Sequence, residues 1–436
     1  MEDLKRNDLS VQAERALLVA VLMPDSTADP TDPVGELRAL VQTAGGQVVD
    51  EMLVKRRKVN PGYYVGSGKA RQIANRAEQN SVEVIVFDND LTPAQVRDLE
   101  EVVGRKVIDR SELILDIFAA HARTNESRLQ VELAQLEYTY PRLRHMWSHL
   151  ERIAGGTDIA VGGIGTRGPG EKQIEIDRRL VQKRVSYLKR QIAQIDRRKI
   201  RQVRRRNQAF CVCLVGYTNA GKSMLMRLLT GADVHIADQL FATLDTKTRR
   251  WNLNNGQTAL LSDTVGFVRD LPHHLIASFR ATLEEAIHAD LLIHVADASH
   301  DHVARQVEAV NGVLDELGCR TDRRLLVLNK TDRINDPTVL TVLRKKYPQA
   351  LELSAVTGSG AKELIAQVAD HHGGSAVRVS LQADCRNGRL MQYIAQYAQV
   401  EEQTYKGTTA RITARMPARQ VEMLRAFGDD VAIVHR

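Results

Sequence analysis

Short apolar runs alternate with helical segments over the first 110 residues of the chain. The runs lie at 16–22, 82–87 and 107–108, and the segments between them have the spacing of amphipathic helices. Strand and helix signals in alternation are typical of an α/β domain, which we place at residues 1–120. Within it, the sequence Gly-Ser-Gly-Lys at 66–69 looks like part of a phosphate loop but lacks the full glycine spacing. We therefore favour an ordinary strand-to-helix turn at this point.

Two later segments repeat apolar residues at the heptad spacing of a helix seam. Between them lies a glycine-rich stretch at 155–170, which cannot be regular helix. The pattern predicts an antiparallel helical hairpin over residues 121–208. The seam residues are Leu129, Leu133, Leu136, Tyr140 and Leu143 in the first helix and Val181, Val185, Leu188, Ile192 and Ile195 in the second.

A complete phosphate-binding loop follows the apolar run at 210–215. Its sequence, GYTNAGKS, leads into a helical pattern, which is the strand–loop–helix context that this motif requires. The glycines let backbone N–H groups approach phosphate oxygens, Lys222 reaches the β- and γ-phosphates, and the Ser223 hydroxyl is a magnesium ligand. The loop residues are Gly216, Tyr217, Thr218, Asn219, Ala220, Gly221, Lys222 and Ser223. The motif predicts a nucleotide-binding domain, which we place at 209–373.

The identity of the base is indicated by a motif that follows a later apolar run and ends at Asp332. A carboxylate in the plane of the base accepts hydrogen bonds from guanine N1–H and N2–H₂, whereas adenine has no such pair of donors. Asp332 therefore selects guanine, Lys330 covers the face of the ring, and the backbone N–H of Ala355 meets the guanine carbonyl. The expected guanine contacts are Asn329, Lys330, Thr331, Asp332, Ser354, Ala355 and Val356.

The remaining site residues lie between these two motifs. Asp263 ends an apolar run and contributes to the magnesium shell, and the N–H of Gly266 senses the γ-phosphate. The third magnesium ligand should be a switch threonine, for which we favour Thr243 and regard Thr246 and Thr248 as hydroxyls that line a strand. The expected contacts in these segments are Phe241, Ala242, Thr243, Asp263, Thr264, Val265 and Gly266. These motifs follow strand patterns in the order of a GTPase domain.

Charge is concentrated in one part of the chain. The net charge of all 436 residues is +7, yet residues 171–207 carry 14 Lys+Arg and 4 Asp+Glu, a net of +10. Such a density suits neutralisation of a nucleic acid backbone, although a solvated spacer is the simpler alternative. The arginines that favour RNA contact are Arg142, Arg144, Arg152, Arg167, Arg204, Arg205 and Arg206.

Composition excludes several classes of protein. Aromatic residues make up only 4% of the chain, which weakens any model built on base stacking. No apolar stretch has the length of a membrane span, and the first ten residues do not resemble a signal peptide, so we expect a cytoplasmic protein. The four cysteines form neither a disulfide framework nor a metal-ligand pattern and are expected to be core thiols.

The motifs together resemble the HflX group of ribosome-associated GTPases. The most specific segments are GGIGTRGPGE at 162–171, FATLD at 241–245 and DTVGF at 263–267, and the resemblance covers most of residues 45–370. It departs at Lys172, Met224, Thr246 and Lys247, which affects fine contacts of the loop and switch. The resemblance implies a P-loop GTPase domain preceded by an α/β domain with a helical hairpin. Residues 374–436 have a strand and helix pattern of their own and are expected to form a small α+β domain.

The resemblance also implies partners and catalytic residues. It implies GTP and GDP as ligands, Mg²⁺ as cofactor, binding to the large ribosomal subunit and its rRNA, and dissociation of stalled or idle ribosomes. Asn219 resembles a residue that holds K⁺ in related GTPases. The expected catalytic residues are Lys222, Thr243, Gly266 and Asn219.

Phe267 occupies the position where many switch GTPases carry a glutamine that orients the attacking water. A phenyl ring cannot hydrogen-bond water, so we expect slow intrinsic hydrolysis with stimulation by the ribosome. Action in ribosome assembly or on free RNA, and an amino-terminal module that uses ATP to remodel RNA, remain as alternatives. Away from the ribosome we expect a monomer.

Overall fold

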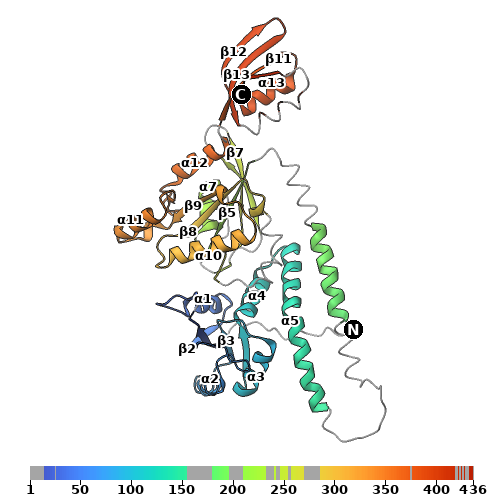
Figure 1. Ribbon diagram of the computed structural model, residues 1–436, viewed down its shortest axis with the longest axis vertical. Coiled ribbons are helices and arrows are strands. Elements are labelled where there is room, and N and C mark those ends of the chain that lie inside the picture. The colour runs from blue at the N-terminus through green and yellow to red at the C-terminus, as the bar shows by residue number, and fades with distance from the viewer. Residues whose placement is uncertain are drawn as a thin grey trace.

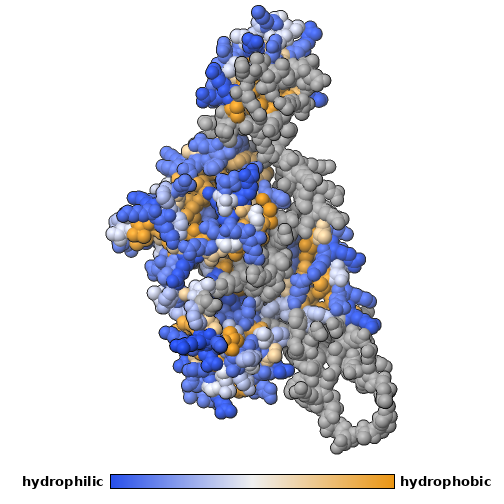
Figure 2. Space-filling view, viewed as in Figure 1, coloured by the Kyte–Doolittle hydropathy of each residue, from blue (hydrophilic) through white to orange (hydrophobic). Residues whose placement is uncertain are grey.

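In the computed structural model, the described part of the chain forms three β-sheets (Figure 1). The structure describes residues 14–154 except 25, then 179–195, 210–231, 240–241, 246–253, 257–269, 285–373 and 376–417, and the positions 421, 424, 427 and 432–435. Hydrophilic side chains cover most of the visible surface of this part, with an apolar patch at helix α11 (Pro337–Lys346), where Val342 is 65% exposed (Figure 2).

The amino-terminal sheet is parallel, with strand order β2-β1-β3-β4. Helices cover both of its faces, which explains why β1 is a continuous apolar run rather than an alternating one. Leu17 and Val19 of β1 face α2 and α3, whereas Ala16 and Leu18 face α1 and α4. The elements are β1 (Arg15–Leu22), α1 (Gly35–Thr43), β2 (Gln47–Lys55), α2 (Ser67–Gln79), β3 (Val84–Phe87), α3 (Pro93–Val103), β4 (Lys106–Asp109) and α4 (Arg110–His121).

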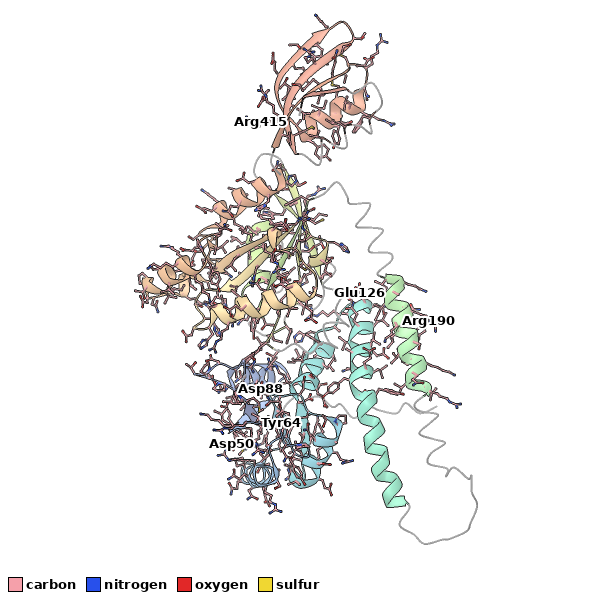
Figure 3. The ribbon with its side chains drawn as sticks, in the orientation of Figure 1. Asp50, Tyr64, Asp88, Glu126, Arg190 and Arg415 are labelled. Carbon is pink, nitrogen blue, oxygen red and sulfur yellow. The ribbon has the colours of Figure 1, made fainter. Side chains whose placement is uncertain are left out.

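A long helix, α5 (Asn125–Ala154), leaves this domain, and a second helix at 179–195 lies beside it (Figures 1 and 3). The predicted heptad helices are thus present, and the glycine-rich stretch between them lies outside the described residues. Arg184 binds Glu132 and Lys189 binds Glu137, each at 2.8 Å, across the two helices. The first turns of α5 belong to the amino-terminal core, because Tyr138 packs there and donates its hydroxyl to Asp109 at 2.5 Å.

The second sheet has strand order β10-β9-β8-β5-β7-β6, with β6 antiparallel to β7 and the other pairs parallel. This mixed sheet with flanking helices confirms the predicted P-loop GTPase fold. Its elements are β5 (Phe210–Gly216), α7 (Lys222–Thr230), β6 (Lys247–Asn252), β7 (Thr258–Asp263), β8 (Leu291–Asp297), α10 (Val303–Glu316), β9 (Arg324–Asn329), α11, β10 (Leu351–Glu352) and α12 (Ala361–Gly373).

The carboxy-terminal sheet is antiparallel, with strand order β12-β13-β11-β14. Its buried face packs on α13 (Gly388–Tyr397), whose Leu390 and Ile394 meet Leu381 and Ile412 of the sheet. A small α+β domain therefore follows the GTPase fold, as predicted. The strands are β11 (Ala376–Asp384), β12 (Gln399–Lys406), β13 (Thr409–Pro417) and β14 (Ala432–His435).

Two further sequence expectations concern membrane-spanning helices and the cysteines. None of the helices in the described ranges combines the length and apolar character that a bilayer crossing requires. Cys213 and Cys319 are buried core thiols, while Cys211 and Cys385 are only half-buried, and all four are free.

Candidate nucleotide-binding site

The phosphate loop connects the buried strand β5 to the amino terminus of α7. Gly221 caps this helix with a φ of +91°, in the left-handed region that favours glycine. The Lys222 ammonium donates to the carbonyls of Gly216 and Tyr217 at 3.1 and 2.8 Å, so the loop curls around it. Burial lowers the pKa of Lys222 to about 8, although nearby Asp263 acts in the opposite direction. A buried ammonium thus lies within the loop at the amino terminus of α7, and helix amino termini favour anions.

Two hard oxygen donors meet at the start of α7. The Ser223 hydroxyl donates to Asp263 Oδ2 at 2.7 Å, and Asp263 is wholly buried at the end of β7. Strands β5 and β7 are hydrogen-bonded neighbours, with Leu214 opposite Asp263, and this register brings the two side chains together. Hydroxyl and carboxylate oxygens are the ligands that Mg²⁺ takes beside substrate phosphates.

The segment after Asp263 runs beside the phosphate loop in the same direction. Phe267 donates its N–H to the Gly216 carbonyl at 3.1 Å and accepts from the Thr218 N–H at 2.7 Å. A methyl group added at Gly266 would lie 2.8 Å from Thr218 Cα and 3.0 Å from Lys222 Nζ. Gly266 therefore lies directly against the loop at the ammonium of Lys222. The Phe267 side chain is 3% exposed and packs in the core, so it does not reach solvent at the site.

The guanine motif folds into one connected unit. Asn329 donates to the Ala220 carbonyl at 2.9 Å and accepts from the Ala355 N–H at 3.0 Å, so it joins the phosphate loop to the segment after β10. Asp332 is exposed and accepts from the Ser354 hydroxyl at 2.6 Å, which fixes the rotation of its carboxylate. Lys330 forms an ion pair with Asp297 at 2.7 Å. Val356 is 67% exposed.

Of the three candidate switch threonines, Thr248 is placed on a strand by the structure. Thr248 lies on β6 and shares a hydrogen bond with Ser262 at 3.0 Å, so its hydroxyl lines a strand. Ala242 and Thr243 lie outside the described residues. Their neighbour Phe241 is buried in the amino-terminal domain, where its ring centroid is 4.6 Å from that of Phe118 on α4.

The structure describes only some of the arginines that are predicted to contact RNA. The backbones of Arg142, Arg144 and Arg152 belong to α5. Arg167 and residues 204–206 lie outside the described residues.

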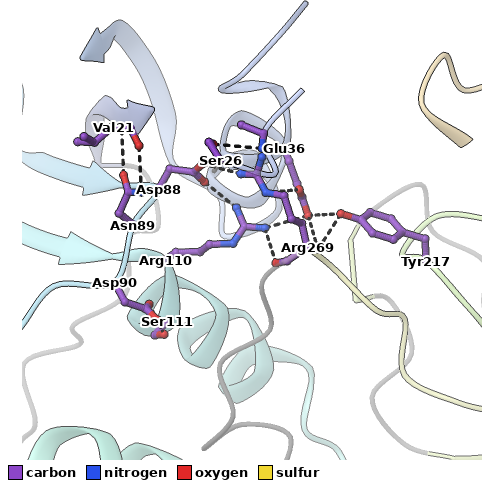
Figure 4. Close-up of polar contacts among 11 residues, drawn as sticks. Val21, Ser26, Glu36, Asp88, Asn89, Asp90, Arg110, Ser111, Tyr217 and Arg269 are labelled. Atoms are coloured by element: carbon purple, nitrogen blue, oxygen red, sulfur yellow. Dashed lines mark hydrogen bonds and ion pairs between the residues drawn. The ribbon is translucent and has the colours of Figure 1, made fainter. Parts of the chain in front are cut away.

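Sequence reasoning missed a set of charged residues beside the phosphate loop (Figure 4). Glu36, Asp88 and Arg110 of the amino-terminal domain contact Tyr217 and Arg269 of the GTPase domain. A signal was present, since Asp88 and Arg110 each directly follow an apolar strand, and the carboxyl ends of parallel strands form binding sites.

Comparison with known proteins assigns the family. Three family models match consecutive parts of the chain: GTP-binding GTPase N-terminal at 31–119, GTP-binding GTPase Middle Region at 121–206 and 50S ribosome-binding GTPase at 211–330. The GTPase HflX of Magnetococcus marinus is 43% identical to this chain over 93% of both proteins. The chain belongs to the HflX family of GTPases. The HflX proteins of Lacrimispora saccharolytica and Escherichia coli are each 40% identical, covering 96% and 93% of this chain and 96% and 94% of their own lengths.

As an HflX-family GTPase, the chain binds and hydrolyses GTP. P-loop GTPases use Mg²⁺ to bridge the β- and γ-phosphates. The oxygen pair of Ser223 and Asp263 fits that ion, because both ligands are hard and lie 2.7 Å apart at the phosphate loop.

Proposed function

We propose that this chain binds the large ribosomal subunit and its rRNA and, in its GTP-bound state, dissociates stalled or idle ribosomes. The observation that carries the proposal is the match of residues 211–330 to a family model described as a 50S ribosome-binding GTPase. The net charge of +10 at 171–207 supports it, because rRNA is a polyanion. Ribosome binding places the chain in the cytoplasm, and we expect a monomer away from the ribosome.

We assign the nucleotide contacts from the geometry of the site. The buried ammonium of Lys222 takes oxygens of the β- and γ-phosphates, and the amides of the loop surround them. Ser223 and Asp263, with Thr243 as the third ligand expected from the sequence, would hold Mg²⁺, which would supply positive charge beside the phosphates. The N–H of Gly266 meets the γ-phosphate, because Gly266 lies beside Lys222 Nζ. At the other end, Asp332, oriented by Ser354, accepts the two guanine donors.

Hydrolysis off the ribosome is slow in this proposal. The buried Phe267 ring leaves the usual glutamine position without a polar group, so the attacking water is oriented by backbone, by another side chain or by the ribosome. Asn219 has a left-handed backbone with a φ of 59° in the phosphate loop. We propose that it holds K⁺, which supplies positive charge at the leaving phosphate. Equal turnover in potassium and sodium buffers with ribosomes present would exclude this role.

The test compares GTP turnover in buffer, with bulk RNA and with purified large subunits. Strong stimulation by mature subunits alone supports the proposal, whereas equal stimulation by bulk RNA or by assembly intermediates favours the alternative role in RNA handling or assembly. Sedimentation of intact ribosomes with the protein then separates binding from splitting. Free subunits should appear with a non-hydrolysable GTP analogue and not with GDP.

A variant at Lys222 tests the third alternative. Lys222→Ala should abolish GTP turnover, since no other residue of the loop carries a positive charge. Residual ATP hydrolysis by this variant would favour a separate site in the amino-terminal domain. In that domain, the segment 66–69 that looks like part of a phosphate loop forms the start of helix α2, and Lys69 Nζ donates to Gln72 Oε1 at 2.9 Å.

A further inference from the structure

Five side chains from two domains form a polar cluster that we call the interdomain clamp (Figure 4). Glu36 lies in the first turn of α1, Asp88 follows β3, and Arg110 begins α4. Tyr217 is the second residue of the phosphate loop, and Arg269 lies three positions after Gly266. The cluster is shielded from solvent, since the side chains of Arg110, Asp88, Arg269 and Glu36 are 3, 7, 12 and 19% exposed.

Glu36 contacts both GTPase-domain members of the clamp. The Tyr217 hydroxyl donates to Glu36 Oε1 at 2.7 Å, and the backbone N–H of Arg269 donates to the same oxygen at 3.2 Å and to the Tyr217 hydroxyl at 2.7 Å. Burial raises the pKa of Tyr217, and Glu36 raises it further, so the hydroxyl keeps its proton and remains a donor. One carboxylate thus joins the phosphate loop to the segment after Gly266.

Asp88 and Arg110 complete the clamp. Asp88 binds Arg269 through one oxygen and Arg110 through the other, each at 2.6 Å. Arg110 also lies 2.9 Å from Glu36 and donates to the Arg269 carbonyl at 3.1 Å. The two arginines balance the two carboxylates, and removal of one partner leaves an uncompensated charge in a shielded place.

The clamp occupies a position where α/β proteins bind ligands. In the order β2-β1-β3-β4, the chain first adds β2 on one side of β1 and then β3 on the other side, so a topological switch point lies between β1 and β3. Open parallel sheets bind ligands at the carboxyl ends of the strands beside such a point. Asp88 lies at this edge, and the adjacent Asn89 holds the two strand ends together through both backbone groups of Val21, at 2.9 and 3.2 Å. In this protein Asp88 binds the guanidinium of Arg269, a side chain of the GTPase domain, at this position.

The clamp flanks the segment that touches the phosphate loop. Tyr217 pairs with Phe267 in a parallel bridge, and Gly266 lies against Thr218 and Lys222. Glu36 therefore holds this segment from its far end, through Arg269, and holds the loop itself through Tyr217.

We propose that Glu36 is a positioning residue that keeps the Gly266 N–H where it meets the γ-phosphate. The proposal rests on the γ-phosphate role assigned to Gly266 under Proposed function. GDP has no γ-phosphate, so this positioning of Gly266 contributes to the binding of GTP and not of GDP. Because linkage is reciprocal, GTP in turn strengthens the contact between the two domains.

The decisive variant is Glu36→Gln in the full chain, which keeps the shape of the side chain and removes its charge. The affinity for a non-hydrolysable GTP analogue should fall by about tenfold, within the usual range of coupling between sites, while GDP affinity stays unchanged. The loss follows from the charge, because glutamine keeps an oxygen that can accept from the Tyr217 hydroxyl and the Arg269 N–H but no longer pairs as an anion with Arg110 and Arg269. Unchanged GDP binding also shows that the variant is folded.

Asp29→Asn is the matched control. Asp29 makes a different contact between the same two domains, with His302 Nε2 at 2.7 Å, and neither residue belongs to the phosphate loop. Its substitution loosens the interface in general and should leave the ratio of the two affinities unchanged. An equal loss of GTP-analogue affinity in Asp29→Asn and Glu36→Gln would overturn the positioning role.

Gly266→Ala separates this inference from the proposed function. Its methyl group would lie 2.8 Å from Thr218 Cα and would displace the Gly266 N–H, so it should lower GTP-analogue affinity more than GDP affinity if Gly266 contacts the γ-phosphate. If Gly266→Ala has no selective effect, the assignment of Gly266 fails, and the inference fails with it. If Gly266→Ala is selective and Glu36→Gln is not, the positioning role alone is wrong.

Discussion

The guanine specificity assigned to Asp332 can be tested by the single substitution Asp332→Asn. Asp332 lies in a short 3₁₀ turn, Thr331–Arg333, directly after β9, and its Oδ1 accepts from the Ser354 hydroxyl at 2.6 Å. Asparagine has the same shape and keeps one oxygen for Ser354. Its amide group then faces the base, where it meets the guanine donors as another donor. In xanthine the C2 carbonyl replaces the N2 amine and accepts from that amide.

The expected loss follows from the hydrogen bonds exchanged. A hydrogen bond to a charged group contributes about 1.5–3 kcal/mol, and the exposed Asp332 carboxylate is expected to make two such bonds to guanine. The part retained by the asparagine oxygen lowers the sum, so we expect GDP affinity to fall by about 2–4 kcal/mol, or roughly 30- to 700-fold. Xanthosine diphosphate should gain affinity in the same variant, because its acceptor matches the new donor.

The assay is fluorescence titration of the nucleotide-free protein with labelled GDP and labelled xanthosine diphosphate. Asp336→Asn is the control, since Asp336 is exposed four positions later and caps α11 through the Thr338 N–H at 2.9 Å. It should leave both affinities unchanged. GDP affinity of Asp332→Asn within about threefold of the parent, less than 1 kcal/mol, would refute the reasoning, because two lost hydrogen bonds cannot cost so little.

Three further predictions concern the loop lysine, the domain contact and the strand threonine. Burial lowers the pKa of Lys222 to about 8 when the site holds no phosphate, and bound phosphates raise it. Nucleotide binding near pH 8 should therefore take up a proton, and the affinity should fall by up to about tenfold for each unit of rising pH. Equal binding heats in two buffers of different ionisation enthalpy would contradict this. Phe118→Ala removes a ring that is 1% exposed and contacts Phe241, and should lower the free energy of unfolding by about 3–5 kcal/mol in urea titrations, whereas a loss below about 1 kcal/mol would show that the contact is dispensable. Thr248→Val should leave GTP turnover unchanged, since its hydroxyl bonds Ser262 on the neighbouring strand; a large loss of turnover would identify Thr248 as the switch ligand instead.

The GTPase site was largely predictable from sequence because its motifs are local. The loop around Lys222 and the segment ending at Asp332 each follow a buried strand, and parallel strands bring their carboxyl ends to one edge. The bond between Asn329 and Ala220 follows from that arrangement, although the two residues are 109 positions apart. The helix at 179–195 was equally predictable from the sequence, because its heptad spacing is a local pattern.

The interdomain contacts were not predictable in the same way. Glu36 lies in the first turn of a helix and Arg269 in a loop, where charged residues are ordinarily solvated. Their pairing depends on how the amino-terminal domain packs against the GTPase domain, and no periodic pattern in the sequence predicts this packing. Phe241 was identified as a switch residue beside the nucleotide, but its burial against Phe118 depends on the same meeting of domains.

The shared apolar cluster has a consequence for any attempt to divide the protein. Phe241, Val265 and Val268 of the GTPase domain are buried among residues of α1, α4 and α5. A fragment that begins near residue 209 would present these three side chains to water. Exposed patches of this kind promote self-association. Rate constants measured on such a fragment would therefore describe a surface that the intact chain keeps covered, and the full-length protein is the appropriate reference for its enzymology.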